Sequence, residues 1–206
     1  MKLYDSIRAP NPRRVRWFMA EKRIEDVEIE QVSLFEGQHR TAEYRAKAGL
    51  PNVPALELDD GTVFTESIAI CRYLESVYPR PNMFGRDASE IAVIEMWTRR
   101  AEMMVATPFM IAVRHSHPAM AALEKQDSDM AKTNLKTAER GLKMLDRQLG
   151  SNKFIAADRL TIADIIAFTG IDFMRMVKYR PPEELTNLMR WHKVMNERPA
   201  AKAGME

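Results

Sequence analysis

Residues 53–68 read VPALELDDGTVFTESI, and they contain the strongest signals of secondary structure in the chain. Within this stretch, Val53–Leu58 predicts a strand, and the Asp-Gly pair in Asp59–Thr62 predicts a hairpin turn because it tolerates positive φ. Val63–Phe64 then begins a returning strand. The apolar spacing after Ser67 predicts a helix. The stretch therefore indicates a β-β-α unit.

The residues ahead of this stretch predict a β-α-β unit. A short strand is expected within residues 2–8, and Pro12 suits the first turn of a helix because its missing N–H costs nothing there. That helix is expected to continue to about Lys22, and Val27–Val32 predicts the next strand. The first part of the chain therefore predicts four strands with helices between them.

The rest of the chain is predicted to be helical. We expect a first domain over residues 1–79, a breaker-rich linker over 80–87 and a helical domain over 88–206. The expected helical segments are Ala88–His115 with a kink near Pro108, Ala131–Leu149, a helix capped by Thr161 and Asp164, and Glu183–Arg198.

Composition narrows the class of protein. The chain has 206 residues, of which 46% are hydrophobic and 29% charged, and its formal net charge is +2. This balance does not predict the concentrated basic face of a nucleic-acid-binding protein. A single cysteine, Cys71, excludes an intramolecular disulfide. The sequence shows neither a signal-peptide core nor a run of about 18 apolar residues, so we expect a cytoplasmic protein with no nucleic-acid or membrane partner.

Two motifs in the opening stretch suggest a binding site. Val53-Pro54 is an X-Pro bond, where cis peptides occur, although most such bonds are trans. Glu66-Ser67 lies at a strand-to-helix junction, where free N–H groups and the helix dipole suit a carboxylate. Glu66 would accept from an ammonium group, so a ligand with both groups on one carbon fits the pair. The alternative for Ser67 is an ordinary helix cap.

Taken together, these motifs resemble the amino-terminal domain of the cytosolic glutathione transferases. The later segment of residues 155–164, IAADRLTIAD, is similar to the family's carboxy-terminal capping box. The resemblance covers nearly the whole chain. It implies a thioredoxin-like domain with a mixed four-stranded sheet, followed by an all-helical domain that forms the second-substrate pocket. It also implies glutathione as co-substrate, no metal, and a homodimer.

The resemblance assigns a role to several residues of the first domain. Val53, ahead of Pro54, would pair its backbone with the cysteinyl part of glutathione, while Glu66-Ser67 would hold the γ-glutamyl end. Asn52 occupies the place of a Lys or Gln that contacts the glycyl carboxylate. The loop residues Gln38 and His39 would reach the same carboxylate.

The position that stabilises the glutathione thiolate departs from the family pattern. Serine-type classes carry a serine where this chain has Ala9, so that role is unfilled. Asn11 offers two amide N–H donors at the predicted helix start, and the bacterial nu-like class has a Thr-Pro-Asn stretch there. We therefore assign thiolate stabilisation to Asn11. Tyr4 lies earlier, inside the predicted strand, and is expected to be a packed aromatic.

Three arginines follow Asn11 in the predicted helix: Arg13, Arg14 and Arg16. Cations in the first turn oppose the helix dipole. Either an anionic ligand nearby offsets that cost, or the three side chains are solvated at the surface.

In the family, the first helix of the second domain lines the electrophile pocket. We therefore expect Met103, Met104 and Phe109 to form a broad apolar site, with a plain core role as the alternative for each. His115 and His117 are two residues apart and would not face each other on a helix, so no metal site is expected.

The function that follows is conjugation of the glutathione thiolate to apolar electrophiles. One alternative is glutathione-dependent reduction of disulfides or peroxides at the same site, which uses the same thiolate. Another is a non-catalytic glutathione-binding or interaction protein, because the fold does not fix the function and the serine position is unfilled.

Overall fold

The computed structural model describes residues 1–205, which divide into two compact units. Residues 1–81 and 202–205 form the first unit, and Asn82–Ala201 forms the second. The division falls inside the expected linker. It differs from the expected boundaries in one respect, because residues 202–205 belong with the first unit rather than with the helical one.

The first unit contains a four-stranded mixed sheet. Its strands are β1 (Lys2–Asp5), β2 (Glu28–Gln31), β3 (Ala55–Glu57) and β4 (Val63–Thr65), in the order β2-β1-β3-β4. β1 pairs with β2 in parallel, and β3 is antiparallel to both β1 and β4. The β-α-β and β-β-α units predicted from the sequence are confirmed.

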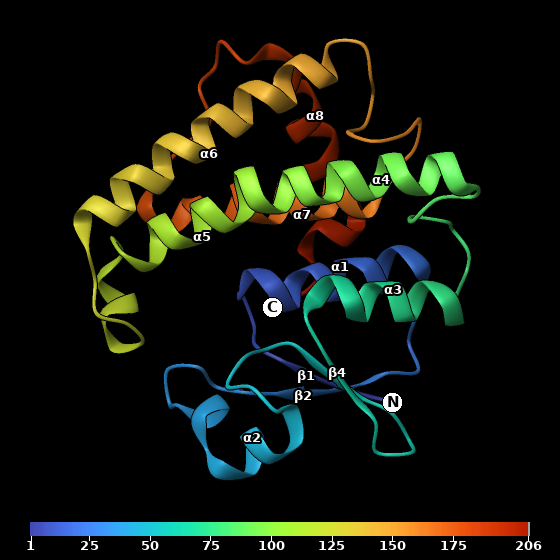
Figure 1. Ribbon diagram of the computed structural model, residues 1–206, viewed down its shortest axis with the longest axis vertical. Helices are drawn as coiled ribbons and strands as arrows, with labels where there is room; N and C mark the ends of the chain where they lie inside the picture. The colour runs from blue at the N-terminus through green and yellow to red at the C-terminus, as the bar shows by residue number, and fades with distance from the viewer. Residues whose placement is uncertain (206) are drawn as a thin grey trace. The chain divides into compact units, whose positions relative to one another are not determined.

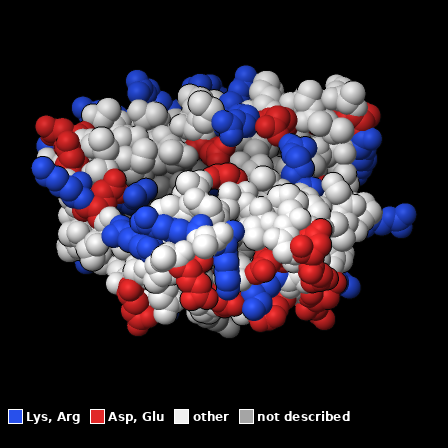
Figure 2. All heavy atoms as spheres, turned by 60° about the horizontal axis from the view of Figure 1, so that its bottom comes forward, with Lys and Arg blue, Asp and Glu red and all other residues white. Residues whose placement is uncertain are grey.

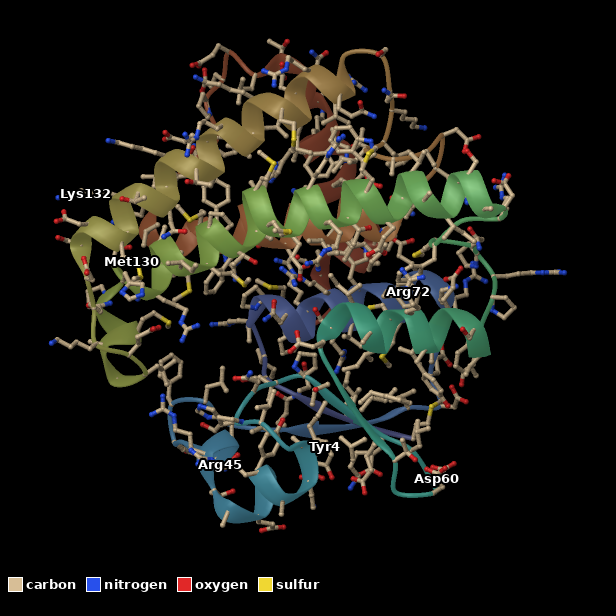
Figure 3. The ribbon with its side chains drawn as sticks, viewed as in Figure 1. Tyr4, Arg45, Asp60, Arg72, Met130 and Lys132 are labelled. Carbon is tan, nitrogen blue, oxygen red and sulfur yellow. The ribbon has the colours of Figure 1, made fainter. Side chains whose placement is uncertain are left out.

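Helices cover both faces of this sheet (Figure 1). α1 (Pro10–Lys22) and α3 (Ser67–Val77) lie on one face, and α2 (Ala42–Ala48), preceded by the 3₁₀ turn η1 (Gln38–Arg40), lies on the other. Successive strand side chains point to opposite faces. Tyr4 accordingly lies between the sheet and α2 (Figure 3). Its ring and that of Tyr44 are nearly perpendicular, with their centroids 5.9 Å apart. Its neighbour Leu3 is fully buried and faces the other way.

Residues 202–205 complete the first unit. The Arg8 backbone N–H donates to the Gly204 carbonyl at 2.9 Å, and the Arg8 Nε donates to the Met205 carbonyl at 3.4 Å. Gly204 has φ +74, and a Cβ built there would lie 3.3 Å from both Arg13 Cα and Arg16 Cβ. The tail therefore packs against the start of α1 and the loop ahead of it.

The second unit is helical. Its elements are α4 (Ala88–Ala101), η2 (Glu102–Ala106), α5 (Thr107–Arg114), η3 (Pro118–Ala122), α6 (Ser128–Leu149), α7 (Ile162–Phe173), η4 (Met174–Val177) and α8 (Thr186–Asn196). The last 3₁₀ turn, η5 (Pro199–Lys202), begins in this unit, and its final residue belongs to the first. α7 is its core helix, and nearly all of its residues are buried. The predicted capping box is present: Asp164 accepts hydrogen bonds from the backbone N–H of Thr161 at 3.0 Å and from the indole N–H of Trp191 at 3.0 Å.

The helix expected over Ala88–His115 contains a π-helical turn, η2, between α4 and α5. The Thr107 N–H donates to the Glu102 carbonyl five residues earlier. Pro108 follows directly and has no N–H to give the carbonyl of Met104, four residues back. The irregularity thus lies ahead of Pro108 rather than at it.

Neighbouring helices approach this turn closely. A Cβ at Gly141 of α6 would lie 2.3 Å from the Met104 carbonyl oxygen, and one at Gly170 of α7 would lie 2.5 Å from Ala106 Cα. Only glycine fits at either contact.

Over residues 1–205, no helix is long and apolar enough to cross a membrane. Acidic and basic side chains are interspersed on the face shown in Figure 2, in keeping with the small net charge.

Candidate functional site

Four chain segments meet at one end of the sheet. β1 and β2 end side by side, with Asp5 opposite Gln31. β3 runs the other way, so its first residue, Ala55, lies beside Tyr4, and β4 ends with Thr65 opposite Ala55. Topology therefore brings to this end of the sheet the segments that carry Asn11, Gln38, Asn52, Val53-Pro54 and Glu66-Ser67.

The start of α1 offers a single free backbone donor. Ala9 is the N-cap and its N–H bonds to the Ser6 carbonyl, while Arg13 N–H bonds to the Ala9 carbonyl. Pro10 and Pro12 have no N–H. Among residues 9–13, only Asn11, between the prolines, keeps a backbone N–H that has no acceptor within the described part of the chain. Its side chain is half-buried, and its amide oxygen likewise has no partner among residues 1–205.

The arginines of α1 are not a solvated surface cluster, so that alternative is wrong for two of the three. Arg13 and Arg14 are buried, and only Arg16 is half-exposed. Arg16 Nη1 lies 3.6 Å from the Asp5 carboxylate, and the Arg13 guanidinium lies 5.8 Å from the centre of the Trp17 ring. Arg14 reaches α3, where its Nη1 donates to Ser67 Oγ at 3.3 Å.

The Val53-Pro54 bond is cis, and it places Ala55 at the start of β3. Val53 is half-buried against the Tyr4–Tyr44 cluster beneath the sheet. The Tyr44 hydroxyl donates to the Asn52 carbonyl at 2.6 Å, so α2 fixes the chain just ahead of Val53. The Asn52 side chain is exposed.

Glu66 and Ser67 form the junction between β4 and α3. Glu66 is exposed and has φ 66, a conformation that costs a non-glycine residue about 1–3 kcal/mol and is held here by the pairing of β4 and the start of α3. Ser67 is the first residue of α3, where the backbone N–H groups of the first turn lack helical acceptors. The pair therefore places a carboxylate beside a hydroxyl and free N–H groups, which complement an ammonium and a carboxylate.

The loop residues predicted to reach the glycyl carboxylate differ in exposure. Gln38 is exposed, but its Oε1 accepts from Ser33 N–H at 2.8 Å and its Nε2 donates to Glu36 Oε2 at 3.2 Å. His39 is buried, and burial lowers the pKa of its imidazole. The Gln38 amide nitrogen has a second N–H that could donate to a ligand carboxylate, whereas His39 exposes little of its surface.

The three residues predicted for the second-substrate pocket all lie in the second unit but in different surroundings. Met103 and Met104 project from the π turn and are 60% and 37% exposed. Phe109 has no exposed surface, and its ring packs against Tyr179 at a centroid distance of 5.4 Å. The two methionines are therefore the surface members of the predicted set, and Phe109 lies in the core behind them.

The residues set aside in the sequence have structural roles. Tyr4 is buried and its hydroxyl bonds to Glu57. Burial raises the pKa of the Cys71 thiol well above its ordinary value. His115 and His117 each accept a backbone N–H through Nδ1. No group of three or more His, Cys, Asp or Glu side chains suited to a metal occurs in residues 1–205.

The whole length of the chain is similar to proteins of one family. Two family models match it: "Glutathione S-transferase, N-terminal domain" over residues 9–77 and "Glutathione S-transferase, C-terminal domain" over residues 100–199. Glutathione S-transferase 2 of Saccharomyces cerevisiae is 32% identical over 209 residues, covering 100% of this chain and 90% of that protein. The chain belongs to the glutathione S-transferase family.

Solved structures of the family agree with the fold. The crystal structure of Gtt2 from Saccharomyces cerevisiae has a TM-score of 0.92 at 33% identity, and the match covers 98% of this chain and 99% of that one. A glutathione S-transferase domain-containing protein from Marinobacter aquaeolei has a TM-score of 0.93 at 35% identity, with 97% and 99% covered. The thioredoxin-like unit followed by a helical domain is thereby confirmed, and the protein is an enzyme of this family.

Two residues of this glutathione S-transferase were missed as parts of the site. Arg14 supports Ser67 from α1, and Tyr44 holds the Asn52 carbonyl from α2. The charge of Arg14 beside the apolar Val15 and Phe18 of the predicted helix was a usable signal, because a buried arginine needs partners. Nothing in the sequence near Tyr44 marks its contact with Asn52.

Proposed function

We propose that this glutathione S-transferase conjugates the thiolate of glutathione to apolar electrophiles. The observation that supports it is the convergence of Asn11, Val53-Pro54 and Glu66-Ser67 at one end of the sheet. In this proposal Glu66 accepts from the γ-glutamyl ammonium, and Ser67 donates to the neighbouring carboxylate. The Val53 backbone pairs with the cysteinyl part, and Asn52 and Gln38 contact the glycyl end.

The chemical step needs only a thiolate. A free thiol has a pKa of about 8.5, so depressing it to about 6.5 corresponds to about 2.7 kcal/mol. The proposed sources are the backbone N–H and side-chain amide of Asn11 together with the positive end of α1. The thiol proton passes to solvent. Sulfur then forms a bond to the electrophilic carbon as the leaving group departs with its electron pair.

Met103 and Met104 are proposed to contact the electrophile. Exposed, adaptable methionine side chains suit apolar molecules of varied shape. Replacing both by serine is expected to raise the KM for an apolar aryl halide while the Kd for glutathione stays the same. An unchanged KM would remove the two methionines from the site.

The direct test combines binding with turnover. Calorimetric titration with glutathione is expected to show a saturable site, and 1-chloro-2,4-dinitrobenzene is expected to be conjugated. Turnover of 2-hydroxyethyl disulfide alone would favour the reductase alternative. Binding without turnover of either would favour a non-catalytic protein, and no binding would refute the proposal.

We also propose a homodimer located in the cytoplasm, as family membership suggests. Light scattering after size exclusion tests the first point, and cell fractionation tests the second. A mass near 23.7 kDa, which is that of one chain, would contradict the dimer.

A further inference from the structure

A buried arginine supports the proposed carboxylate site from behind. Arg14 on α1 is 2% exposed, and Ser67 at the start of α3 is 5% exposed. Arg14 Nη1 lies 3.3 Å from Ser67 Oγ, a contact between residues 53 positions apart. The hydrogen bond joins α1, near its start, to the first residue of α3.

The chemistry of the two groups fixes the direction of this hydrogen bond. A guanidinium has five N–H donors and no acceptor, so Ser67 Oγ must be the acceptor. A hydroxyl that accepts still has one O–H to donate. Within residues 1–205, the Ser67 hydroxyl has no acceptor for that hydrogen. Arg14 therefore makes Ser67 a donor toward a group that the chain itself does not supply.

The local charge selects an anion as that group. The first-turn N–H groups of α3 and the helix dipole give this point a positive potential, and Arg14 directs the remaining Ser67 hydrogen toward it. Glu66, one residue earlier, is exposed and supplies a carboxylate for a cation. A ligand with a carboxylate and an ammonium group on one carbon satisfies both.

We infer that Arg14 is a positioning residue for the α-carboxylate of the γ-glutamyl group, acting through Ser67. The inference rests on the proposed function, because it presupposes that glutathione binds at this end of the sheet. The affinity for that one carboxylate then depends on a side chain that does not touch the ligand.

The test uses three peptides with two variants. The peptides are glutathione, 4-aminobutyryl-cysteinyl-glycine, which lacks the α-carboxylate, and glutaryl-cysteinyl-glycine, which lacks the ammonium. The variants are Arg14→Met, which removes the donor, and Arg14→Lys, which keeps a charge without the planar fork. Kd is measured by calorimetry, and thermal unfolding by circular dichroism checks that each variant is folded.

We expect Arg14→Met to weaken binding of the two peptides that carry the carboxylate by about tenfold to a hundredfold. The peptide without it should bind wild type and variant equally. The Kd values of Arg14→Lys for the two carboxylate-bearing peptides should fall between those of wild type and Arg14→Met. If Arg14→Met does not fold, Arg14→Lys serves as the test variant. Arg16→Met, which removes a charge from the same helix without a contact to Ser67, is the matched control and should leave the peptide ratios unchanged.

A double-mutant cycle measures the coupling between Arg14 and Ser67 in glutathione binding. Once Ser67→Ala is present, adding Arg14→Met should cost little further affinity for glutathione. Equal losses for all three peptides, or fully additive losses with Ser67→Ala, would overturn the role of Arg14 alone. Failure of the wild-type protein to bind glutathione would instead overturn the proposed function.

Discussion

The prolines on either side of Asn11 determine what the start of α1 can offer to a ligand. An ordinary helix presents several free N–H groups in its first turn. Here two of those positions are prolines, and the Ala9 and Arg13 N–H groups are already bonded. The anion-binding capacity of this helix end is thereby concentrated on the Asn11 N–H and its amide side chain.

Replacing Asn11 by alanine separates the side chain from the backbone. Alanine keeps the N–H and removes the amide, so we expect the pKa of the bound glutathione thiol to rise by about one unit, from about 6.5 to about 7.5. The thiolate fraction at pH 7, and with it kcat/KM, should then fall by about threefold. Thiolate absorbance against pH measures the first effect. Asn152→Ala, at an exposed asparagine of the second unit, is the control. An unchanged thiol pKa would assign the role to the backbone N–H.

The sequence predicted single residues best where the surroundings of a residue depend on its neighbours in the chain. The Glu66-Ser67 junction and the cis Val53-Pro54 bond lie where the motifs predicted. The burial of Arg14 was not predicted, because its partner Ser67 lies 53 residues away and periodicity reports only one helix at a time.

The position of the π turn η2 is determined by tertiary packing rather than by local sequence. Pro108 is visible in the sequence and predicted an irregular helix, but the turn lies ahead of it. Gly141 and Gly170 bring α6 and α7 against the backbone of this turn. These contacts join segments that are far apart in the chain, so the sequence predicted a helix and a kink but not the π turn.

Substitution of Gly170 tests this packing. A methyl group there would lie 2.5 Å from Ala106 Cα, so we expect Gly170→Ala to lower the free energy of unfolding by about 1–3 kcal/mol. The shift of the turn should also change the KM for the electrophile while the Kd for glutathione stays constant. Thermal denaturation and steady-state kinetics measure the two effects.

Gly150 provides the matched control for that substitution. It lies in helical backbone conformation at the end of α6, and a Cβ there would meet no atom nearer than 3.2 Å. Gly150→Ala should change the free energy of unfolding by less than about 0.5 kcal/mol. Equal effects of the two alanines would show that the close approach at Gly170 is relieved without cost.

Across the whole molecule, long-range contacts hold each unit together, and one in the second unit predicts a pH dependence. The Arg159 guanidinium binds both oxygens of Glu90 and also the carbonyl and side-chain oxygen of Asn82. It thus fastens the first residues of the unit to the loop ahead of α7. The hydrogen bond from Arg159 lowers the pKa of Glu90 to about 2.

A carboxylate with a depressed folded-state pKa stabilises the fold above its ordinary pKa of 4.5 and loses that contribution as pH falls toward 2. We expect Glu90→Gln to cost about 2 kcal/mol at pH 7, with the difference from wild type shrinking between pH 5 and pH 3. Thermal unfolding of both proteins at each pH measures this difference. The comparison cancels other titrations, such as that of the half-buried His192. Glu197→Gln, in an exposed pair with Lys193, should show no such trend.

The order of the two units was predictable from the pattern of apolar residues. Ahead of the breaker-rich linker this pattern indicates alternating strands and helices, and after it helices alone. The return of residues 202–205 to the first unit was not predictable. Their bonds to Arg8 are accepted by the backbone carbonyls of Gly204 and Met205, which any residue could supply.

That return has a consequence for synthesis on the ribosome. Translation proceeds from the amino terminus, and domains generally fold as they emerge. The sheet of the first unit is complete once β4 has been made, yet residues 202–205 appear only after all of Asn82–Ala201. A nascent chain therefore carries a folded sheet whose Ser6–Ala9 loop lacks its final hydrogen bonds, and the loop ahead of Asn11 is the last part of the first unit to be completed.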